Sequence, residues 1–441
     1  MSPGIIRGNA ALTGYGMVEW SSGGLELAVL AWEFPPRLVG GLGTYAQEIS
    51  AQFVRMGHDV TVFTLNEGFL PTRDVWSGVD VHRPLLVNII EAFPQSTVED
   101  IRKRYHDVGF LAHILCYNIS SSLSLVYDLA RKDHRKFDIV VSHDWLSIIG
   151  GMITRRELDI PLVFHVHSTE QGRSLGGGSQ YITELEQKGG LTADRVVTVS
   201  NPMRDELVAH GFPESQLRVC HNGVDSTKYD PATVSHEDVK RLRASFGVGE
   251  DEKMILFLGR LSAVKGVDRL VMAMPSILEK VPKAKLVIVG VGDMQRHLLE
   301  LISRYGLQKT VRTRFEWISE RERILHYAAC DVCAIPSLYE PFGIVCLEAM
   351  SMGKPVVIGA RGTSGMRETV VNTGPDRCGY HVNAFEPTDI AWGIENVLSD
   401  EKDAKTMGVN GRRRVIQVYT WEIAARNTIR IYEEVLDSRP G

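Results

Sequence analysis

The 441-residue sequence has no long run of basic residues, and its formal net charge is only −5. Proteins whose main ligand is a nucleic acid usually present a strongly basic face, so this class is excluded as the main function. No uncharged apolar stretch approaches the ~18–20 residues of a membrane-spanning helix, which predicts a soluble protein without an integral membrane span. The segment from Met1 to Gly24 has no apolar core behind Arg7, so no secretory signal is expected, and the predicted location is the cytoplasm.

Cysteine is scarce as well, with six residues in the whole chain. Cys330 and Cys333 form a lone C-x-x-C pair, and the second pair that a four-cysteine zinc site requires is missing. Several of the other cysteines stand inside apolar runs, which favours buried free thiols and a reducing compartment. The ordinary composition, with 44% hydrophobic and 23% charged residues, and the chain length predict two or three globular domains.

Short apolar runs alternate with helical patterns along most of the chain. In the first half these runs are Leu25–Trp32, Asp59–Thr64, Phe137–Ser142, Pro161–His167 and Arg195–Ser200. In the second half they are Met254–Leu258, Lys285–Val289, Val311–Phe315, Val332–Ile335 and Pro355–Gly359. Continuous apolar strands separated by helices indicate parallel sheets covered by helices on both faces. Because two such series exceed what one sheet comfortably holds, the sequence predicts an α/β fold with two Rossmann-like, doubly wound domains.

The boundary between the two domains is expected between Asn222 and Lys253, where glycine, proline and the acidic run Glu250–Glu252 give a linker-like composition. The predicted divisions are a poorly ordered N-terminal extension (1–24), a first domain (25–230), a second domain (250–419) and a C-terminal helix (420–437).

A glycine-rich loop follows the first predicted strand, at the sheet edge where parallel α/β domains bind their ligands. Gly40 and Gly41 lie within the run Val39-Gly-Gly-Leu-Gly43, directly before a predicted helix. Glycines let the backbone approach a ligand closely, and the N–H groups at a helix start can bind an anion. A tight strand-to-helix turn without a ligand explains the same residues about equally well.

A basic loop follows the first strand of the second domain. Arg260 and Lys265 stand five residues apart, with Gly259 and Gly266 on either side. A guanidinium fork and an ammonium group at the ligand edge of a sheet suit a diphosphate, and the flanking glycines allow an anion-binding turn. Two solvated surface cations are the alternative.

Two glutamates eight residues apart are the most specific feature of the sequence. Glu340 precedes a predicted helix, where a carboxylate also suits the positive end of the helix dipole. Glu348 lies inside that helix among apolar residues, so it is expected to be buried, and a buried carboxylate needs partners. Sugar or ribose hydroxyls could be those partners. The chain has no D-x-D pair to bind a divalent metal ion on a diphosphate, so the charge of a leaving nucleotide would fall to side chains such as Arg260 and Lys265.

Three histidines end two neighbouring predicted strands. His165 and His167 are two residues apart and therefore point to the same side of a continuing strand, and His143 with Asp144 ends the strand before. The residues suit a metal cluster of the H-x-H type. A core histidine beside a turn histidine is the commoner outcome, and a neutral histidine that binds a polar ligand lies between the two.

The run from Ser337 to Gly343, together with Glu348, resembles the E-x7-E signature of retaining glycosyltransferases with the GT-B fold. The basic loop, the glycine loop, Ser200 after a strand, and the run Asn222–Asp225 match this family in order, so the resemblance covers nearly the whole chain from Leu25 to Val435. The runs Trp32–Pro36 and His167–Glu170 are similar to the glycogen-synthase-like members of glycosyltransferase family 4.

The resemblance implies a GT-B architecture, with two Rossmann-like domains facing a central cleft. It implies an acceptor side in the first domain, a donor side in the second, and a final helix that crosses back onto the first domain. Arg260 and Lys265 would bind the diphosphate, Glu348 the ribose, and Glu340 and His167 the transferred sugar. The residues expected to bind the donor are Gly40, Gly41, Arg260, Lys265, Ile318, Glu340, Phe342, Gly343, Ile344, Val345 and Glu348, and those expected to take part in catalysis are His167, Arg260, Lys265 and Glu340.

The expected reaction transfers a hexosyl group from UDP- or ADP-glucose to a hydroxyl acceptor with retention of configuration, and without a cofactor or a catalytic metal ion. A glycogen- or starch-synthase-like role in α-glucan synthesis is the leading expectation. Two departures from the ADP-glucose-using synthases leave the donor base and the acceptor open: Leu38 stands where those enzymes have a lysine, and Thr363–Met366 stands where they have a glycine pair.

The alternatives differ in chemistry. The acceptor could be a lipid-linked or cell-surface glycan or a small osmolyte precursor. A nucleotide-sugar epimerase or a phosphorylase could share the fold. The least favoured alternative is a zinc hydrolase built on His143, Asp144, His165 and His167. The oligomeric state is left open.

Overall fold

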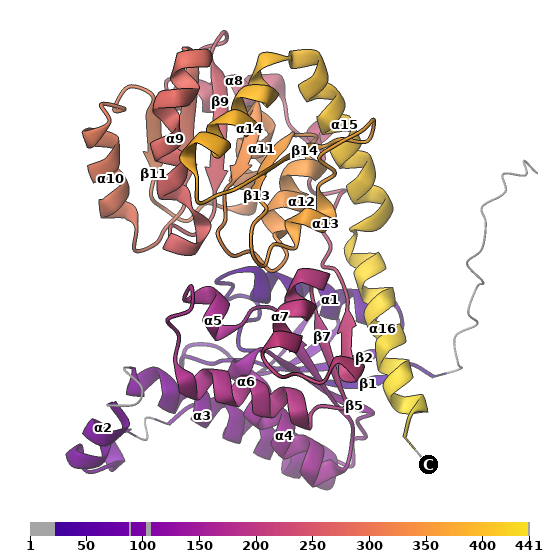
Figure 1. Cartoon of the computed structure of the whole chain (residues 1–441). Coiled ribbons are helices and arrows are strands. Elements are labelled where there is room, and N and C mark those ends of the chain that lie inside the picture. Colours follow the sequence, from indigo (N-terminus) through magenta and orange to yellow (C-terminus); the bar gives the residue numbers. More distant parts are fainter. Residues whose placement is uncertain (1–22, 88–89, 103–106, 440–441) are drawn as a thin grey trace, which may run out of the picture.

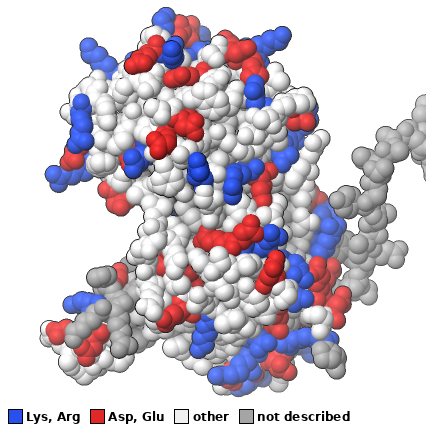
Figure 2. Space-filling view, viewed as in Figure 1, with Lys and Arg blue, Asp and Glu red and all other residues white. Residues whose placement is uncertain are grey.

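A computed structural model describes residues 23–87, 90–102 and 107–439, which form two α/β domains drawn one above the other in Figure 1. The extension predicted for 1–24 lies, up to residue 22, outside the described residues. Both domains are built on mostly parallel sheets, so the predicted α/β class with two Rossmann-like domains is confirmed. Figure 2 shows acidic and basic side chains spread over both domains on this face.

The sheet of the first domain has eight strands in the order β3-β4-β2-β1-β5-β6-β7-β8. Their bounds are β1 Glu26–Leu30, β2 Asp59–Phe63, β3 Arg73–Trp76, β4 Val79–His82, β5 Ile139–His143, β6 Leu162–Val166, β7 Arg195–Thr198 and β8 Leu217–Val219. Neighbouring strands are parallel except β3 and β4, which form an antiparallel pair at the edge. The sequence predicted β1, β2, β5, β6 and β7 but not β3, β4 or β8.

Helices cover both faces of this first sheet. Their bounds are α1 Gly41–Arg55, α2 Gln95–Arg102, α3 Val108–Leu123, the π-helical continuation Ser124–Lys132, α4 Trp145–Leu158, α5 Glu170–Arg173, α6 Gln180–Thr192 and α7 Asn201–Ala209. Successive residues of β1 alternate between the two faces, as a strand requires. Leu27 and Val29 pack in the cluster that contains α1, whereas Ala28 and Leu30 pack in the cluster that contains α3 and α4.

The sheet of the second domain has six parallel strands in the order β11-β10-β9-β12-β13-β14. Their bounds are β9 Lys253–Leu258, β10 Ala284–Val289, β11 Val311–Arg314, β12 Val332–Ile335, β13 Val356–Gly359 and β14 Gly379–Val382. The helices of this domain are α8 His236–Ser245, α9 Val267–Lys280, α10 Gln295–Arg304, α11 Glu320–Ala329, α12 Ile344–Ser351, α13 Met366–Thr369, α14 Pro387–Ser399 and α15 Glu401–Val418. From β9 the chain first adds β10 and β11 on one side and then β12, β13 and β14 on the other, as in doubly wound folds.

The last helix, α16 (Trp421–Asp437), leaves the second domain and packs against α1 of the first (Figure 1). Its buried residues Trp421, Ile429 and Tyr432 join the same core cluster as Leu27 and Tyr45. The chain therefore passes between the domains twice, once before α8 and once before α16.

One helix of the described chain, Val108–Lys132, is long and apolar enough to cross a membrane by length and composition. The expectation that no stretch approaches this length is therefore wrong. Half of the most apolar window of this helix is buried, and α3 packs against α4, as expected for a helix of the core.

Candidate active site

The glycine loop and the basic loop meet where the two domains face each other. Gly40 precedes α1, and a Cβ atom on Gly40 would lie only 3.3 Å from the Arg260 guanidinium. A Cβ atom on Gly41 would lie 3.8 Å from the Ile344 side chain, at the start of α12. The predicted glycine and basic loops, which lie more than 200 residues apart in the chain, thus form two sides of one site.

The N–H groups of the glycine loop are partly in use within the protein. The Glu33 carboxylate accepts hydrogen bonds from the N–H groups of Val39 (3.0 Å) and Gly40 (3.1 Å). These two N–H groups are therefore not free to bind an anionic ligand. The first N–H groups of α1 itself have no acceptor within the helix, because α-helical hydrogen bonds begin one turn later.

The Lys265 ammonium group lies 2.6 Å from the Glu340 carboxylate, and the Ser337 hydroxyl donates to the same oxygen at 3.0 Å. Arg260 follows β9 directly and is exposed. The site therefore holds one free guanidinium and one ammonium whose charge is matched by a carboxylate. An incoming diphosphate would share Lys265 with Glu340, which brings the predicted phosphate-binding and sugar-binding residues into direct contact.

The four residues before and at the start of α12 have different environments. Gly343 has φ = +93°, and a Cβ atom there would lie 2.7 Å from Met366, so this position requires glycine. Ile344 and Val345 form the first turn of the helix and are partly buried. The Phe342 side chain is only 3% exposed and packs between His221 and Tyr419. Only the backbone of Phe342 therefore remains available to a nucleotide-sugar ligand.

Ile318 lies directly before α11, on the same side of the second sheet as the residues of α12 that pack in its core. Its side chain is partly buried against that core.

The Glu348 carboxylate is 3% exposed and is surrounded by three protein partners. Arg323 and the Tyr229 hydroxyl donate to one oxygen at 3.1 Å and 2.9 Å, and the Tyr327 hydroxyl donates to the other at 2.8 Å. The expectation that a ligand must satisfy this carboxylate is wrong, because the protein does so itself. The nearby carboxylate raises the pKa of Arg323, and burial raises the pKa of Tyr327.

We therefore expect Glu348→Gln to lower the free energy of unfolding by about 1–3 kcal/mol, because Arg323 loses its charged partner in a largely buried site. Chemical denaturation measures this change. Glu422→Gln, which breaks the exposed pair with Arg426 on α16, is the matched control and should change stability little. Equal effects of the two substitutions would contradict a structural role for Glu348.

Three histidines on the α1 side of the first sheet come together as the strand pattern predicted. His143 of β5 pairs in register with His165 of β6, and His167 is the residue that directly follows β6. One nitrogen from each ring lies within 4.8 Å of the others, and this is the metal-capable cluster found in the described part of the chain. Burial lowers the pKa values of all three rings and so favours their neutral forms.

Asp144 does not join the histidine cluster, although the sequence suggested it as a ligand. Its carboxylate accepts the backbone N–H of His167 at 2.7 Å. Asp144 has φ = +53° and ψ = 179°, a costly conformation for a residue other than glycine, and such strain concentrates at functional sites. Two consecutive residues therefore hold His167 from two sides: the Asp144 carboxylate binds its backbone N–H, and the His143 ring contacts its ring.

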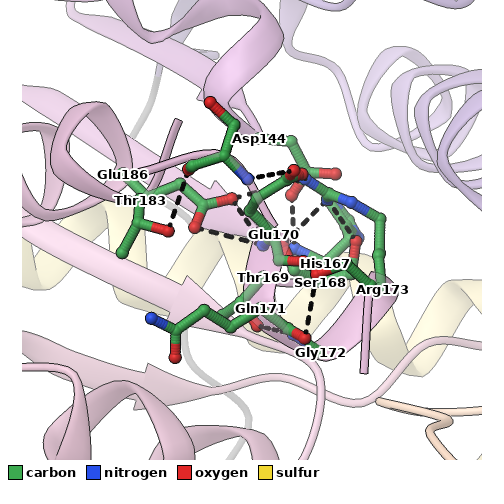
Figure 3. Close-up of polar contacts among 12 residues, drawn as sticks. Asp144, His167, Ser168, Thr169, Glu170, Gln171, Gly172, Arg173, Thr183 and Glu186 are labelled. Carbon is green, nitrogen blue, oxygen red and sulfur yellow. Dashed lines mark hydrogen bonds and ion pairs between the residues drawn. The ribbon is translucent and has the colours of Figure 1, made fainter. Parts of the chain in front are cut away.

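A polar network continues from His167 into α5 and α6 (Figure 3). Arg173 donates to Ser168 and to the carboxylates of Glu170 and Glu186. The Glu186 carboxylate also accepts the N–H of Glu170 at 3.0 Å. Burial raises the pKa of Glu186 to about 8, although Arg173 opposes the shift. This network fixes the loop that presents His167, and the sequence analysis missed it.

Hydrogen bonds join the two domains next to these residues. The Ser200 hydroxyl donates to the carbonyl of Pro341 at 2.6 Å, and the N–H of Thr169 donates to the Tyr339 hydroxyl at 3.0 Å. Both second-domain partners belong to the run that ends in Gly343. The loop of the E-x7-E motif is therefore held against the strand ends of the first domain.

A separate cavity of about 670 Å³ lies at the outer edge of the second sheet, lined by Ala244–Gly247 and Arg312–Arg314. Arg312 donates to backbone carbonyls, and Arg314 pairs with Glu316 and Glu322. Since its cations already have partners and it lies apart from the glycine loop, the basic loop and the E-x7-E motif, this cavity is not a candidate active site.

Two facing Rossmann-like domains with a basic loop and an E-x7-E helix define the GT-B class of glycosyltransferases. Comparison with family models agrees with this class. The model of Glycosyltransferase Family 4 matches residues 39–228, and that of Glycosyl transferases group 1 matches residues 238–414.

The chain is 33% identical over 418 residues to an uncharacterized glycosyltransferase of Methanocaldococcus jannaschii, which covers 94% of this chain and 99% of that protein. It is 26% identical over 422 residues to a glycogen synthase of Mycobacterium tuberculosis, with 92% and 94% of the two chains covered. The structure matches sucrose-phosphate synthase from Thermosynechococcus elongatus with a TM-score of 0.74, at 22% identity over 94% of this chain and all of the other. The chain belongs to the GT-B glycosyltransferases, in the lineage of family 4.

Proposed function

We propose that the protein is a retaining hexosyltransferase that moves a glucosyl or related group from a nucleotide sugar to a hydroxyl acceptor without a catalytic metal ion. One observation carries the proposal: Arg260, beside the glycine loop, and the Lys265–Glu340 pair converge where the two domains meet. A cationic side chain for a diphosphate and a carboxylate for a sugar thereby stand next to each other.

The geometry suits a reaction in which negative charge develops on the leaving diphosphate. Arg260, Lys265 and the start of α1 stabilise that charge, each well-placed donor by about 2–4 kcal/mol. Glu340 and His167 contact the sugar, on which positive charge develops. The leaving phosphate takes the proton of the acceptor hydroxyl, so the reaction needs no separate general base.

Similar proteins that were solved with a nucleotide or a nucleotide sugar support a nucleotide-sugar donor, but they leave the acceptor open. Anabaena HepE, solved in complex with UDP-glucose, and starch synthase IV of Arabidopsis thaliana, solved with ADP and acarbose, share the fold, with TM-scores of 0.68 and 0.72. A glycogen synthase, an α-maltose-1-phosphate synthase and a D-inositol 3-phosphate glycosyltransferase are 26–28% identical to this chain. We propose an α-glucan acceptor first, and a phosphorylated small acceptor second.

A screen of purified protein with UDP-glucose and ADP-glucose against glucan, phosphorylated sugar and phosphorylated cyclitol acceptors tests the proposal. Release of one nucleotide that depends on an acceptor supports it. Release of an isomerised nucleotide sugar without an acceptor, or consumption of inorganic phosphate, would instead indicate the epimerase or phosphorylase chemistry.

We expect EDTA to leave the transferase rate undiminished, because the sequence has no D-x-D pair and the cations of the site are side chains. Initial rates before and after dialysis against EDTA measure this. A loss of activity that zinc or manganese restores would contradict metal-independent catalysis.

A further inference from the structure

The histidine cluster has a geometry that sugar binding by His167 does not require. His143 and His165 are 1% and 2% exposed and lie behind His167, which is partly exposed. His143 Nδ1 and His167 Nε2 face each other at 3.1 Å, and a nitrogen of His165 lies within 4.8 Å of both. A sugar can contact only the most accessible of the three rings, so the proposed transfer leaves the other two without a task.

The spacing of these nitrogens is close to that of a metal site. Tetrahedral coordination with zinc–nitrogen bonds of about 2.0–2.1 Å places the ligand nitrogens about 3.4 Å apart. The His143–His167 pair is already near this value, and the nitrogen of His165, within 4.8 Å of the others, must move closer.

The surroundings of His165 match the outer shell of a histidine metal site. Its Nε2 lies 2.9 Å from the Tyr432 hydroxyl of α16, and its Nδ1 lies 3.4 Å from the Tyr45 hydroxyl of α1. When Nε2 donates to Tyr432, the lone pair is on Nδ1. Ligand histidines in metalloproteins typically donate their second nitrogen to an oxygen in this way.

We infer that His143, His165 and His167 form a binding site for a borderline divalent transition-metal ion such as Zn²⁺ or Co²⁺. In the metal-free protein the His143 and His167 rings share one hydrogen bond, and the two nitrogens of His165 contact the hydroxyls of Tyr432 and Tyr45. Binding requires that the proton between His143 and His167 move to the outward nitrogen of its own ring, and that the Tyr45 hydroxyl release His165 Nδ1.

The consequence for activity rests on the proposed function. A metal ion that holds His167 Nε2 withdraws this ring from the sugar, so the metal inhibits the transferase rather than assisting it. The site is thus compatible with an enzyme that EDTA does not inactivate.

Calorimetric titration of EDTA-treated protein with Zn²⁺, together with the visible absorption of the Co²⁺ complex, tests the site without reference to activity. We expect one ion per chain with tetrahedral Co²⁺ absorption. His143→Asn and His165→Asn should each weaken Zn²⁺ binding by more than ~100-fold, and Tyr432→Phe by about 10-fold, as for the loss of an outer-shell partner. His297→Asn, at an exposed histidine of α10, is the matched control and should leave binding unchanged.

Circular dichroism of each variant checks that its fold is retained, and Tyr432→Phe keeps the test informative where a buried histidine variant is unstable. No stoichiometric binding by the wild-type chain, or binding that survives His143→Asn and His165→Asn, would overturn the site. Inhibition of transfer at the same Zn²⁺ concentrations that saturate the calorimetric site supports the coupling. Saturation without inhibition keeps the site but contradicts the role of His167 at the sugar, so the two proposals fail separately.

Discussion

Arg260→Ala and Lys265→Ala are each expected to lower turnover by about two orders of magnitude or more. Each removes a cation from the place where the leaving diphosphate gains charge, and Lys265→Ala also leaves Glu340 without its partner at 2.6 Å. Both residues lie on the loop between β9 and α9, so the fold should be unaffected. Initial rates with saturating donor, beside thermal unfolding of each variant, measure the two effects.

Lys283→Ala and Arg296→Ala are the matched controls, because both side chains are exposed cations of the same domain. They should retain normal kinetics. A variant of Arg260 or Lys265 with nearly wild-type turnover would remove the proposed diphosphate site.

Glu340→Gln is expected to depress turnover about 100-fold while free UDP or ADP binds almost as before. The substitution keeps the shape and the hydrogen bond from Ser337 but removes the charge that faces the sugar and pairs with Lys265. Calorimetric titration with each nucleotide, beside initial rates, separates the effect on binding from the effect on the chemical step.

Glu348→Gln gives the contrast within the same motif. Because the Glu348 carboxylate is held by Arg323, Tyr229 and Tyr327, its loss should appear first as lower stability and only second as weaker nucleotide binding. If both substitutions weaken the nucleotide equally, the division of roles within the E-x7-E pair is wrong.

Much of the architecture could be predicted because buried parallel strands are continuous apolar runs. That rule holds for β1, β2, β5, β6, β7, β9, β10, β12 and β13. The antiparallel edge strand Arg73–Trp76 escaped prediction because it is largely exposed and has no apolar run. The edge strand Gly379–Val382 begins with a glycine and is short, which hides it in the same way.

The sequence was sufficient to predict which residues belong to the candidate site, but not which side chains contact one another there. Strand order alone placed His143 beside His165, since both end neighbouring parallel strands. The partners of Glu348 could not be inferred, because Tyr229 lies 119 residues away in the chain. One signal was available: Arg323 and Tyr327 are four residues apart on α11 and therefore share one face of the helix.

The residue pattern of the last helix does not predict which domain the helix packs against. Apolar residues along Trp421–Asp437 predict an amphipathic helix but not its neighbour. Contacts of Trp421 and Tyr432 with the core around Tyr45 place it on the first domain. Through Tyr432, this helix also reaches the histidine cluster.

The anomeric configuration of the product tests the central proposal most directly. The enzyme is given α-linked UDP-glucose or ADP-glucose together with the acceptor that the screen identifies, and proton NMR spectra are recorded during the first turnovers. A retaining transferase forms the α-linked product as nucleoside diphosphate is released. A β-linked product would contradict retention, and no transfer to any hydroxyl acceptor would contradict the assignment of Arg260, Lys265 and Glu340 to a nucleotide-sugar site.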